Sequence, residues 1–245
     1  MGLTTPAGGP GAAARRPAAG RQKGPVTVRA VPPGAATAPG RRERKKLATR
    51  AAVREAALRL ALRHGVANVT VEQIATEADI AVRTFFNHFG SKEEAIVAAA
   101  AAGAEALIAE FRARPRTEPV LRALRQAVLA VLDRDDEATR ACIRAMWLIT
   151  RSPSLVPHQL GVLAAQERAL ADAITERLGP RAAGGVYPRL CAATALTALR
   201  VALHDWLQHA TGPDATPPVA DLRDQVDRVI AELAAGLDRP APAAR

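Results

Sequence analysis

Apolar residues recur every three or four positions along most of the chain, and glycine, proline and short polar stretches interrupt the pattern. This spacing places the apolar side chains on one face of a helix, whereas a strand would alternate at every second residue. The first such segment runs from Arg41 to His64 and ends at Gly65, a residue that favours a helix C-terminus. Apolar residues make up 49% of the chain but aromatic residues only 3%, so alanine, the best helix former, supplies much of the core. The pattern predicts an all-α fold, with further helices over residues 119–133, 137–151, 154–178, 188–209 and 218–237.

A segment in the N-terminal half predicts two short helices joined by a tight turn, followed by a longer helix. Thr70 and Gln73 have the spacing of a capping box, in which each residue's side chain bonds to the other's backbone N–H. The second short helix is expected over residues 82–88. Ser91 and Glu94 have the same spacing as the first pair and predict a second capping box at the start of the longer helix.

Basic residues are concentrated at the start of the chain. Residues 1–40 hold five basic and no acidic residues, residues 41–92 hold eleven basic and five acidic, and residues 93–245 hold eighteen basic and nineteen acidic. The net charge of +10 therefore lies almost entirely in the first 92 residues, which favours a polyanion as the partner of that part. Nucleic acid is favoured over a membrane surface because no basic helix here has a bulky apolar face.

The composition also predicts three regions. Residues 1–40 contain seven prolines and eight glycines with almost no bulky side chains, so we expect a disordered basic tail. This tail either touches DNA phosphates without sequence preference or has no role. The capped short helices lie in an expected DNA-binding domain over residues 41–92, and a helical body follows over residues 93–240.

The residues that end and pack the N-terminal helices form a specific combined pattern. On this pattern the region resembles the DNA-binding domain of the tetracycline-repressor (TetR) family, and its basic and aromatic runs also resemble the mycofactocin-cluster regulators. The resemblance implies a three-helix helix-turn-helix domain followed by a helical bundle for ligand binding and dimerisation. The matching residues are Thr49-Arg50, Ala56-Ala57, Gly65, Thr70-Val71, Ile74-Ala75, Ala78, Thr84-Phe85-Phe86, His88-Phe89 and Ser91-Lys92-Glu93.

The resemblance implies that the N-terminal domain binds a double-stranded DNA operator. Arginine can pair with guanine through two hydrogen bonds, asparagine can do so with adenine, and a threonine methyl group can touch thymine. Phosphate contacts, which give affinity and register, fall to Arg42, Lys45, Lys46, Arg50, Thr70, Val71 and Lys92. Base contacts fall to Arg83, Thr84, Asn87 and His88.

Three positions depart from the family pattern, one of them Ala61, where a phenylalanine is common. Phe86 stands where the family often has tyrosine, so a hydroxyl contact to phosphate is lost. Phe86 is a candidate for DNA contact, and packing in the core is an expectation at least as well supported. Ala81 replaces the usual serine cap of the recognition helix, which removes about 1 kcal/mol of capping.

The last two expected helices carry apolar seams at three- and four-residue spacing. The resemblance implies that these helices pair with their copies in a homodimer, and packing within one subunit is the alternative. A dimer is favoured because one small recognition helix reads too few bases, and two half-sites solve this. The seam residues are Leu196, Leu199, Leu203 and Trp206 in one helix, and Leu222, Val226, Val229, Leu233 and Leu237 in the other.

A pocket for a small-molecule effector is also implied by the resemblance. The helix over residues 137–151 combines a large indole with a soft thioether, as pocket walls often do, although core packing is the alternative. Arg144 and Arg151 suggest an anionic effector such as an acyl-coenzyme A, unless they are surface arginines. The candidate ligand-binding residues are Cys142, Met146, Trp147 and Arg151.

Other classes of protein lack support in the sequence. There is no nucleophile elbow, phosphate-binding glycine loop, Cys-His zinc pattern or pair of catalytic carboxylates, so we expect no enzyme, cofactor or metal site. No uninterrupted apolar run has membrane-spanning length, no signal peptide is evident, and Cys142 and Cys191 fit reduced thiols, which together predict a cytoplasmic protein. The sequence predicts a ligand-released homodimeric repressor; the alternative is an architectural or constitutive DNA-binding protein without an effector.

Overall fold

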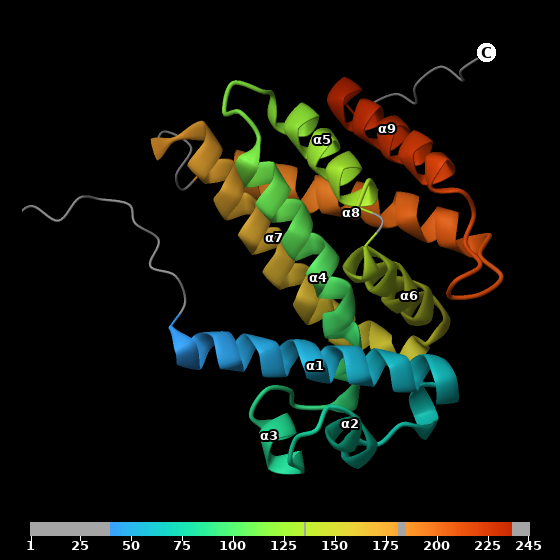
Figure 1. Cartoon of the computed structure of the whole chain (residues 1–245). Helices are drawn as coiled ribbons and strands as arrows, with labels where there is room; N and C mark the ends of the chain where they lie inside the picture. The colour runs from blue at the N-terminus through green and yellow to red at the C-terminus, as the bar shows by residue number, and fades with distance from the viewer. Residues whose placement is uncertain (1–39, 135, 181–184, 237–245) are drawn as a thin grey trace, which may run out of the picture. The chain divides into compact units, whose positions relative to one another are not determined.

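The computed structural model describes residues 40–134, 136–180 and 185–236. Within these ranges the regular structure is helical and contains no strand, which confirms the predicted all-α fold (Figure 1). The expected disorder of residues 1–39 and the seam residue Leu237 lie outside the described residues. The helices are α1 (Arg41–His64), η1 (Val66–Asn68), α2 (Val71–Glu77), α3 (Val82–Phe86), α4 (Lys92–Ala113), α5 (Val120–Leu132), α6 (Glu137–Arg151), η2 (Pro153–Leu155), α7 (Val156–Leu178), α8 (Val186–Gln208) and α9 (Val219–Ala235).

Local hydrogen bonds set the ends of the short helices. The predicted capping box of α2 is confirmed, because Gln73 N donates to Thr70 Oγ1 over 3.3 Å and Thr70 N donates to Gln73 Oε1 over 2.9 Å. At α4 the second box is only half formed. Ser91 Oγ accepts from Glu94 N at 3.1 Å, but the Glu94 carboxylate accepts from Gly90 N at 2.7 Å instead of from Ser91 N.

The turn between α2 and α3 sets the angle of the recognition helix. Asp79 adopts a left-handed backbone with φ of 51°, a conformation that aspartate tolerates better than most residues. The helix α3 ends at Phe86, two residues earlier than expected, and Asn87 continues with a helical φ of −73° as its C-cap.

The N-terminal helices share one apolar core, and this core continues past residue 92. Val53, Ile74 and Phe85 are fully buried in it, and α1 packs across α2 and α4. The same cluster includes the first two turns of α4, from Ala95 to Ala99, and also Leu148 near the end of α6. The DNA-binding helices therefore rest directly on two helices of the body.

A second apolar core lies among α4, α5 and α7 to α9. Trp206 of α8 is fully buried in it, and its indole N–H donates to Pro218 O over 3.1 Å. On the surface of this core, Arg125 of α5 makes two hydrogen bonds of 2.6 Å to the Asp227 carboxylate of α9. Met146 and Trp147 of α6 pack against both cores, so α6 connects them.

The apolar seams expected at a dimer interface face inward instead. Leu196 and Trp206 of α8, and Leu222 and Val226 of α9, are buried in the core of their own subunit. For these residues the alternative of packing within one subunit is therefore correct. They face inward because α8 and α9 pack against each other and against α7 and α5.

A different face of α8 is exposed. Three large apolar side chains lie on it: Val186 (76% exposed), Leu190 (58%) and Val201 (43%). Their spacing of four and eleven residues places them on one side of the helix. By length and composition, α8 is also the one helix among the described residues that could span a membrane. In the fold it lies between α7 and α9, where an apolar helix covers the core of the bundle (Figure 1).

Candidate DNA interface and ligand cavity

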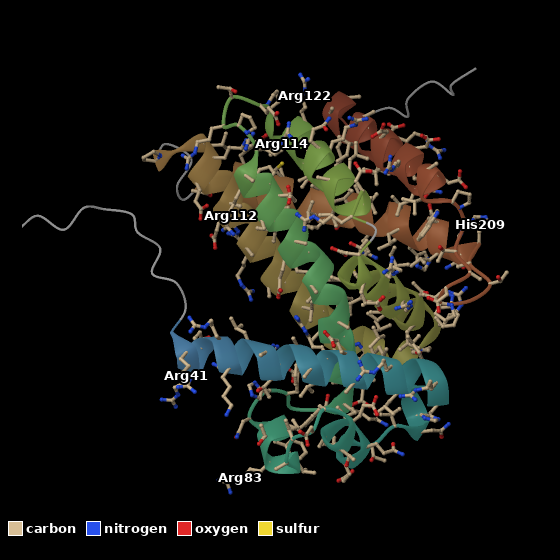
Figure 2. All side chains as sticks on the ribbon, in the orientation of Figure 1. Arg41, Arg83, Arg112, Arg114, Arg122 and His209 are labelled. Carbon is tan, nitrogen blue, oxygen red and sulfur yellow. The ribbon has the colours of Figure 1, made fainter. Side chains whose placement is uncertain are left out.

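The outer face of α3 carries the predicted base readers. Arg83 and Asn87 are exposed one helical turn apart, and Thr84 beside them is half-buried. Figure 2 shows Arg83 on α3 and Arg41 at the start of α1 both pointing away from the helices of the body. The inward face carries Phe85, which is fully buried, so the orientation of the outer face is fixed by the core.

Phe86 does not pack in the core, and that expectation is wrong. Its side chain is 55% exposed, whereas Phe85 and Phe89 fill the interior. The ring of Phe86 touches only the edge of this aromatic cluster, at 5.4 Å from the Phe85 centroid and nearly perpendicular to it (87°). Successive residues of a helix point about 100° apart, so Phe85 and Phe86 cannot both face inward.

Two predicted DNA-contact residues take part in holding α3 against α1. Arg50 Nη1 donates to the backbone oxygen of His88 over 2.9 Å, and its guanidinium lies 4.4 Å from the centre of the Phe89 ring. The His88 side chain is half-buried, and its Nδ1 atom is buried without a hydrogen-bond partner among the described residues. His88 therefore presents less of its polar edge to the outside than Arg83 or Asn87 does.

The ammonium group of Lys92 binds inside the domain. It donates to three carbonyl oxygens around η1, those of Val66 (3.0 Å), Ala67 (3.3 Å) and Val69 (2.7 Å). An ammonium group has three N–H donors, so this arrangement uses all of them. Lys92 thereby fixes the loop before Thr70, and the expected contact between Lys92 and a phosphate stays a prediction.

The remaining predicted phosphate contacts lie at the surface. Arg42, Lys45 and Lys46 are exposed on the first turns of α1. Thr70 is exposed at the start of α2, where its hydroxyl already accepts the capping hydrogen bond, and Val71 beside it is half-buried. The surface next to α3 therefore combines a row of free basic groups with a helix start, which suits a phosphate backbone.

A cavity of about 220 Å³ lies in the body of the protein, among α4 to α9. Its lining is mostly aliphatic, with Leu107 from α4, Leu163 from α7 and Leu199 from α8 as examples. The charged side chains in the lining include Arg134, which forms an ion pair with Glu110. A predominantly apolar lining with few polar groups is typical of small-molecule sites.

The structure divides the predicted ligand-binding residues into two pairs. Cys142 and Met146 line the cavity, whereas Trp147 and Arg151 lie outside its lining. Arg151 donates to the backbone oxygens of Leu207 (3.4 Å) and Ala210 (2.9 Å) and stacks over Trp147 with its guanidinium carbon 4.7 Å from the ring centre. These carbonyls at the end of α8 attract the guanidinium and hold it away from the cavity.

Arg144, the second arginine considered for an anionic effector, is also engaged at the surface. Its guanidinium donates to Glu137 and to Asp214, each over 2.6 Å. Both carboxylates raise the pKa of Arg144, and Asp214 has the largest effect. Arg144 and Arg151 thus have their guanidinium groups engaged by protein oxygens, which agrees with the alternative to an anionic effector.

The side chain of Cys142 on α6 lies close against α4. A Cβ atom placed on Gly103 would be 2.4 Å from Cys142 Sγ, a distance at which either the thiol must rotate or the helices must separate. The thiol donates to Ala100 O over 3.5 Å, and burial raises the pKa of Cys142 to about 11. Cys142 is therefore a protonated, unreactive part of the cavity wall at neutral pH.

Sequence reasoning missed most of the cavity lining, including Leu163, Leu199 and Arg200. An aliphatic residue beside a cavity has the same spacing as one in a filled core, so no sequence pattern distinguishes the two. Gly103 was the one available signal, since a glycine inside a helix costs about 1 kcal/mol and usually has a packing reason. No cluster of three or more potential metal ligands occurs among the residues that the structure describes.

The comparisons with known proteins define the class of this protein. Residues 53–100 match the family described as bacterial regulatory proteins of the tetR family, and residues 118–238 match a profile described as the MftR C-terminal domain. The HTH-type transcriptional regulator TcmR of Streptomyces glaucescens is 34% identical over 208 residues, which are 82% of this chain and 92% of that protein. The chain belongs to the TetR family and is a DNA-binding transcription regulator, as its sequence predicted.

Solved structures of low sequence identity share the fold. A TetR-family transcriptional regulator from Rhodococcus sp. has a TM-score of 0.50 at 15% identity, covering 77% of this chain and 98% of its own. FadR of Thermus thermophilus, a TetR-family repressor solved in complex with lauroyl-CoA, has a TM-score of 0.49 at 23% identity, covering 80% and 99%. The two domain matches and the fold of the Rhodococcus regulator agree with the predicted plan of a helix-turn-helix domain followed by a helical body.

Proposed function

We propose that this regulator is a homodimeric repressor that an apolar small molecule releases from its operator. The observation that carries this proposal is the position of the cavity: its walls include α4 and α6, and these two helices also pack against α1 of the DNA-binding domain. A ligand that binds better to a conformation with α4 and α6 displaced would shift the population away from the DNA-binding state. No enzymatic step is part of this function, and the cytoplasm is the compartment in which it operates.

The division of labour along the chain follows the predicted regions. Residues 41–92 bind DNA and residues 93–240 bind the ligand and the second subunit, with α4 common to both parts. Arg83 and Asn87 read bases in the major groove, with Thr84 and His88 beside them, because these side chains lie on the outer face of α3.

The phosphate contacts surround the base readers. Arg42, Lys45 and Lys46 contact phosphates from α1, where all three are exposed, and Thr70 with the Val71 backbone does so from the start of α2. Arg50 and Lys92 have their donors on backbone carbonyls, so their main contribution is to hold α3 and η1 in position for the DNA.

The dimer interface is proposed on the exposed face of α8 and its groove with α9. Val186, Leu190 and Val201 are large, apolar and exposed along one side of α8. Val229 and Leu233 of α9 continue this surface, because they line a groove that they share with α8. An apolar surface of this kind is stabilised when a second copy covers it.

The effector is proposed to be largely aliphatic. Leu107, Leu163 and Leu199 line the cavity, and the acidic Glu110 already neutralises Arg134. Among the described residues of the lining, Arg200 is exposed and has no ion-pair partner, so it is the group that would meet an anion at the cavity mouth. An acyl chain of an acyl-coenzyme A fits this distribution, with its charged part outside.

The test fills the cavity without touching the DNA-binding domain. Acyl-coenzyme A compounds of graded chain length are added to the protein bound to an operator selected from random DNA, and release is followed by fluorescence anisotropy. Leu163→Trp should keep operator affinity within about threefold but lose at least about tenfold in effector response, equivalent to about 1.4 kcal/mol. Leu160→Trp is the matched control, since Leu160 lies on the same helix, is 63% exposed and is absent from the lining.

The alternative function, an architectural DNA-binding protein, makes the opposite prediction in the same assay. Such a protein would select no defined sequence from the random pool, and its binding would depend on salt alone. A selected palindrome that no ligand releases would instead indicate a constitutive repressor.

A further inference from the structure

Phe86 is an apolar side chain in the middle of a polar surface. Its side chain is 55% exposed. In the sequence it lies between Arg83 and Asn87, which are both exposed. Among the described residues of α2, α3 and α4, it is the only large hydrophobic side chain exposed to this extent. On a surface that is proposed to meet DNA, an exposed aromatic ring gains from a contact that removes it from water.

We propose that Phe86 packs against the 5-methyl group of a thymine in the operator, next to the base pair that Arg83 contacts. This inference rests on the proposed function, since it assumes that the outer face of α3 enters the major groove. The 5-methyl group of thymine is the one apolar group that a base pair presents in that groove, and a phenylalanine ring is a suitable partner for it.

Other partners for the ring are less compatible with its chemistry and position. A phenyl ring has no donor for a phosphate oxygen, so it cannot replace the contact that a tyrosine hydroxyl would make. The interior of the domain is already filled by Phe85 and Phe89, which are 0% and 2% exposed. Insertion between base pairs is a device of minor-groove proteins, whereas a helix-turn-helix domain places its second helix in the major groove.

The geometry of the aromatic cluster prepares Phe86 for this contact. Phe85 is fixed in the core, and its ring meets the Phe86 ring edge to face with 5.4 Å between centroids. An aromatic pair of this kind is favourable in itself and limits the side-chain rotation of Phe86. The ring is therefore held in place before DNA binds, and little conformational entropy is lost on binding.

The experiment removes the methyl group from the DNA and the ring from the protein separately. An operator is selected from random DNA by the full chain, and each thymine is then replaced in both half-sites by deoxyuridine, which lacks only the methyl group. At one thymine position, we expect the replacement to lower operator affinity about fourfold per half-site, which is the effect of one buried methyl group. Replacement in both half-sites should lower it about 15-fold. That loss should disappear in Phe86→Ala and remain in Phe86→Tyr, which keeps the ring.

Thr84→Ser is the control variant. Thr84 carries the only other methyl group among the α3 side chains that are proposed to contact bases, and serine lacks it. The deoxyuridine effect should persist in this variant. An equal effect of deoxyuridine in wild type and Phe86→Ala, or no sensitive thymine in wild-type protein, would overturn the inference. If Phe86→Ala does not fold, the wild-type and Thr84→Ser series decide together, because a deoxyuridine effect that disappears in Thr84→Ser would assign the contact to Thr84 and overturn the inference. Failure to select any operator would instead refute the proposed function.

Discussion

At the scale of single residues, hydrogen-bond engagement separates the basic groups of the DNA-binding domain. Arg50 and Lys92 donate to backbone carbonyls within the domain, so their charges are partly committed to the fold. Arg83 and Lys45 are exposed on α3 and α1. The sequence shows only that all four are basic; their different roles come from the carbonyl oxygens that the fold brings near two of them.

Arg83→Ala tests base reading directly. Loss of an arginine–guanine pair should weaken operator binding by about 1–3 kcal/mol per half-site and relax the preference at one base pair. Lys45→Ala is the comparison: binding should weaken about equally on all sequences, and the slope of log affinity against log salt should fall by about 1 per half-site. Titrations on the operator and on its single-base variants measure both effects. Unchanged sequence preference in Arg83→Ala would contradict the assignment of base reading.

Cys142 should react slowly with alkylating reagents in the folded protein. Burial raises its thiol pKa from 9.0 to about 11, so only about one molecule in 1,000 carries the thiolate at pH 8, against about one in ten for an unperturbed thiol. We therefore expect iodoacetamide to modify Cys142 about 100-fold more slowly in the native protein than in urea, and faster as the pH rises. Peptide mass spectrometry over time gives the rates, and equal rates in both states would contradict this environment.

At the scale of helices, α4 and α6 make a close contact in the wall of the cavity. Gly103 has no side chain, and the Cys142 thiol occupies the space that a Cβ atom would need. Both residues also line the cavity. The residues that fix the distance between α4 and α6 are therefore also residues that a ligand in the cavity would touch.

Gly103→Ala measures this constraint. The new methyl group would lie 2.4 Å from Cys142 Sγ, so overpacking should lower the free energy of unfolding by about 1–3 kcal/mol, although alanine favours the helix. In the Cys142→Ala background the same change meets no sulfur, and the gain in helix propensity, about 1 kcal/mol, should then dominate. Urea unfolding of the two single variants and the double variant gives the coupling energy. Additive effects would mean that α4 and α6 adjust freely.

The sequence predicted the helices well because their ends are determined locally. The bounds of α6 match the expected range of 137–151, and Thr70 and Gln73 form the predicted capping box. Features that depend on the packing of distant segments were not predictable in this way. The exposed position of Phe86 and the location of Arg151 outside the cavity both depend on how helices face one another, which periodicity does not determine.

At the scale of the whole subunit, the two cores are joined by α4 and α6. The N-terminal core includes Leu148 from the last turns of α6, and the core of the body includes Leu107 from the second half of α4. A change in the spacing of these helices therefore acts on both cores at once. In the proposed dimer, the angle of α4 in each subunit determines where its α3 lies relative to the other copy.

Dimerisation through α8 determines whether two recognition helices act together. Leu190→Asp places one carboxylate from each copy in the proposed interface, and burial of unpaired charges there should weaken the dimer by more than about 100-fold. Leu190 is 58% exposed in the subunit, so the subunit itself should still fold, with an unchanged helical circular-dichroism spectrum. Analytical ultracentrifugation measures the mass, and operator titration should show weaker binding, because a monomer reads one half-site only. The control is Leu160→Asp on α7, and a dimer that persists in Leu190→Asp would exclude this face of α8 as the interface.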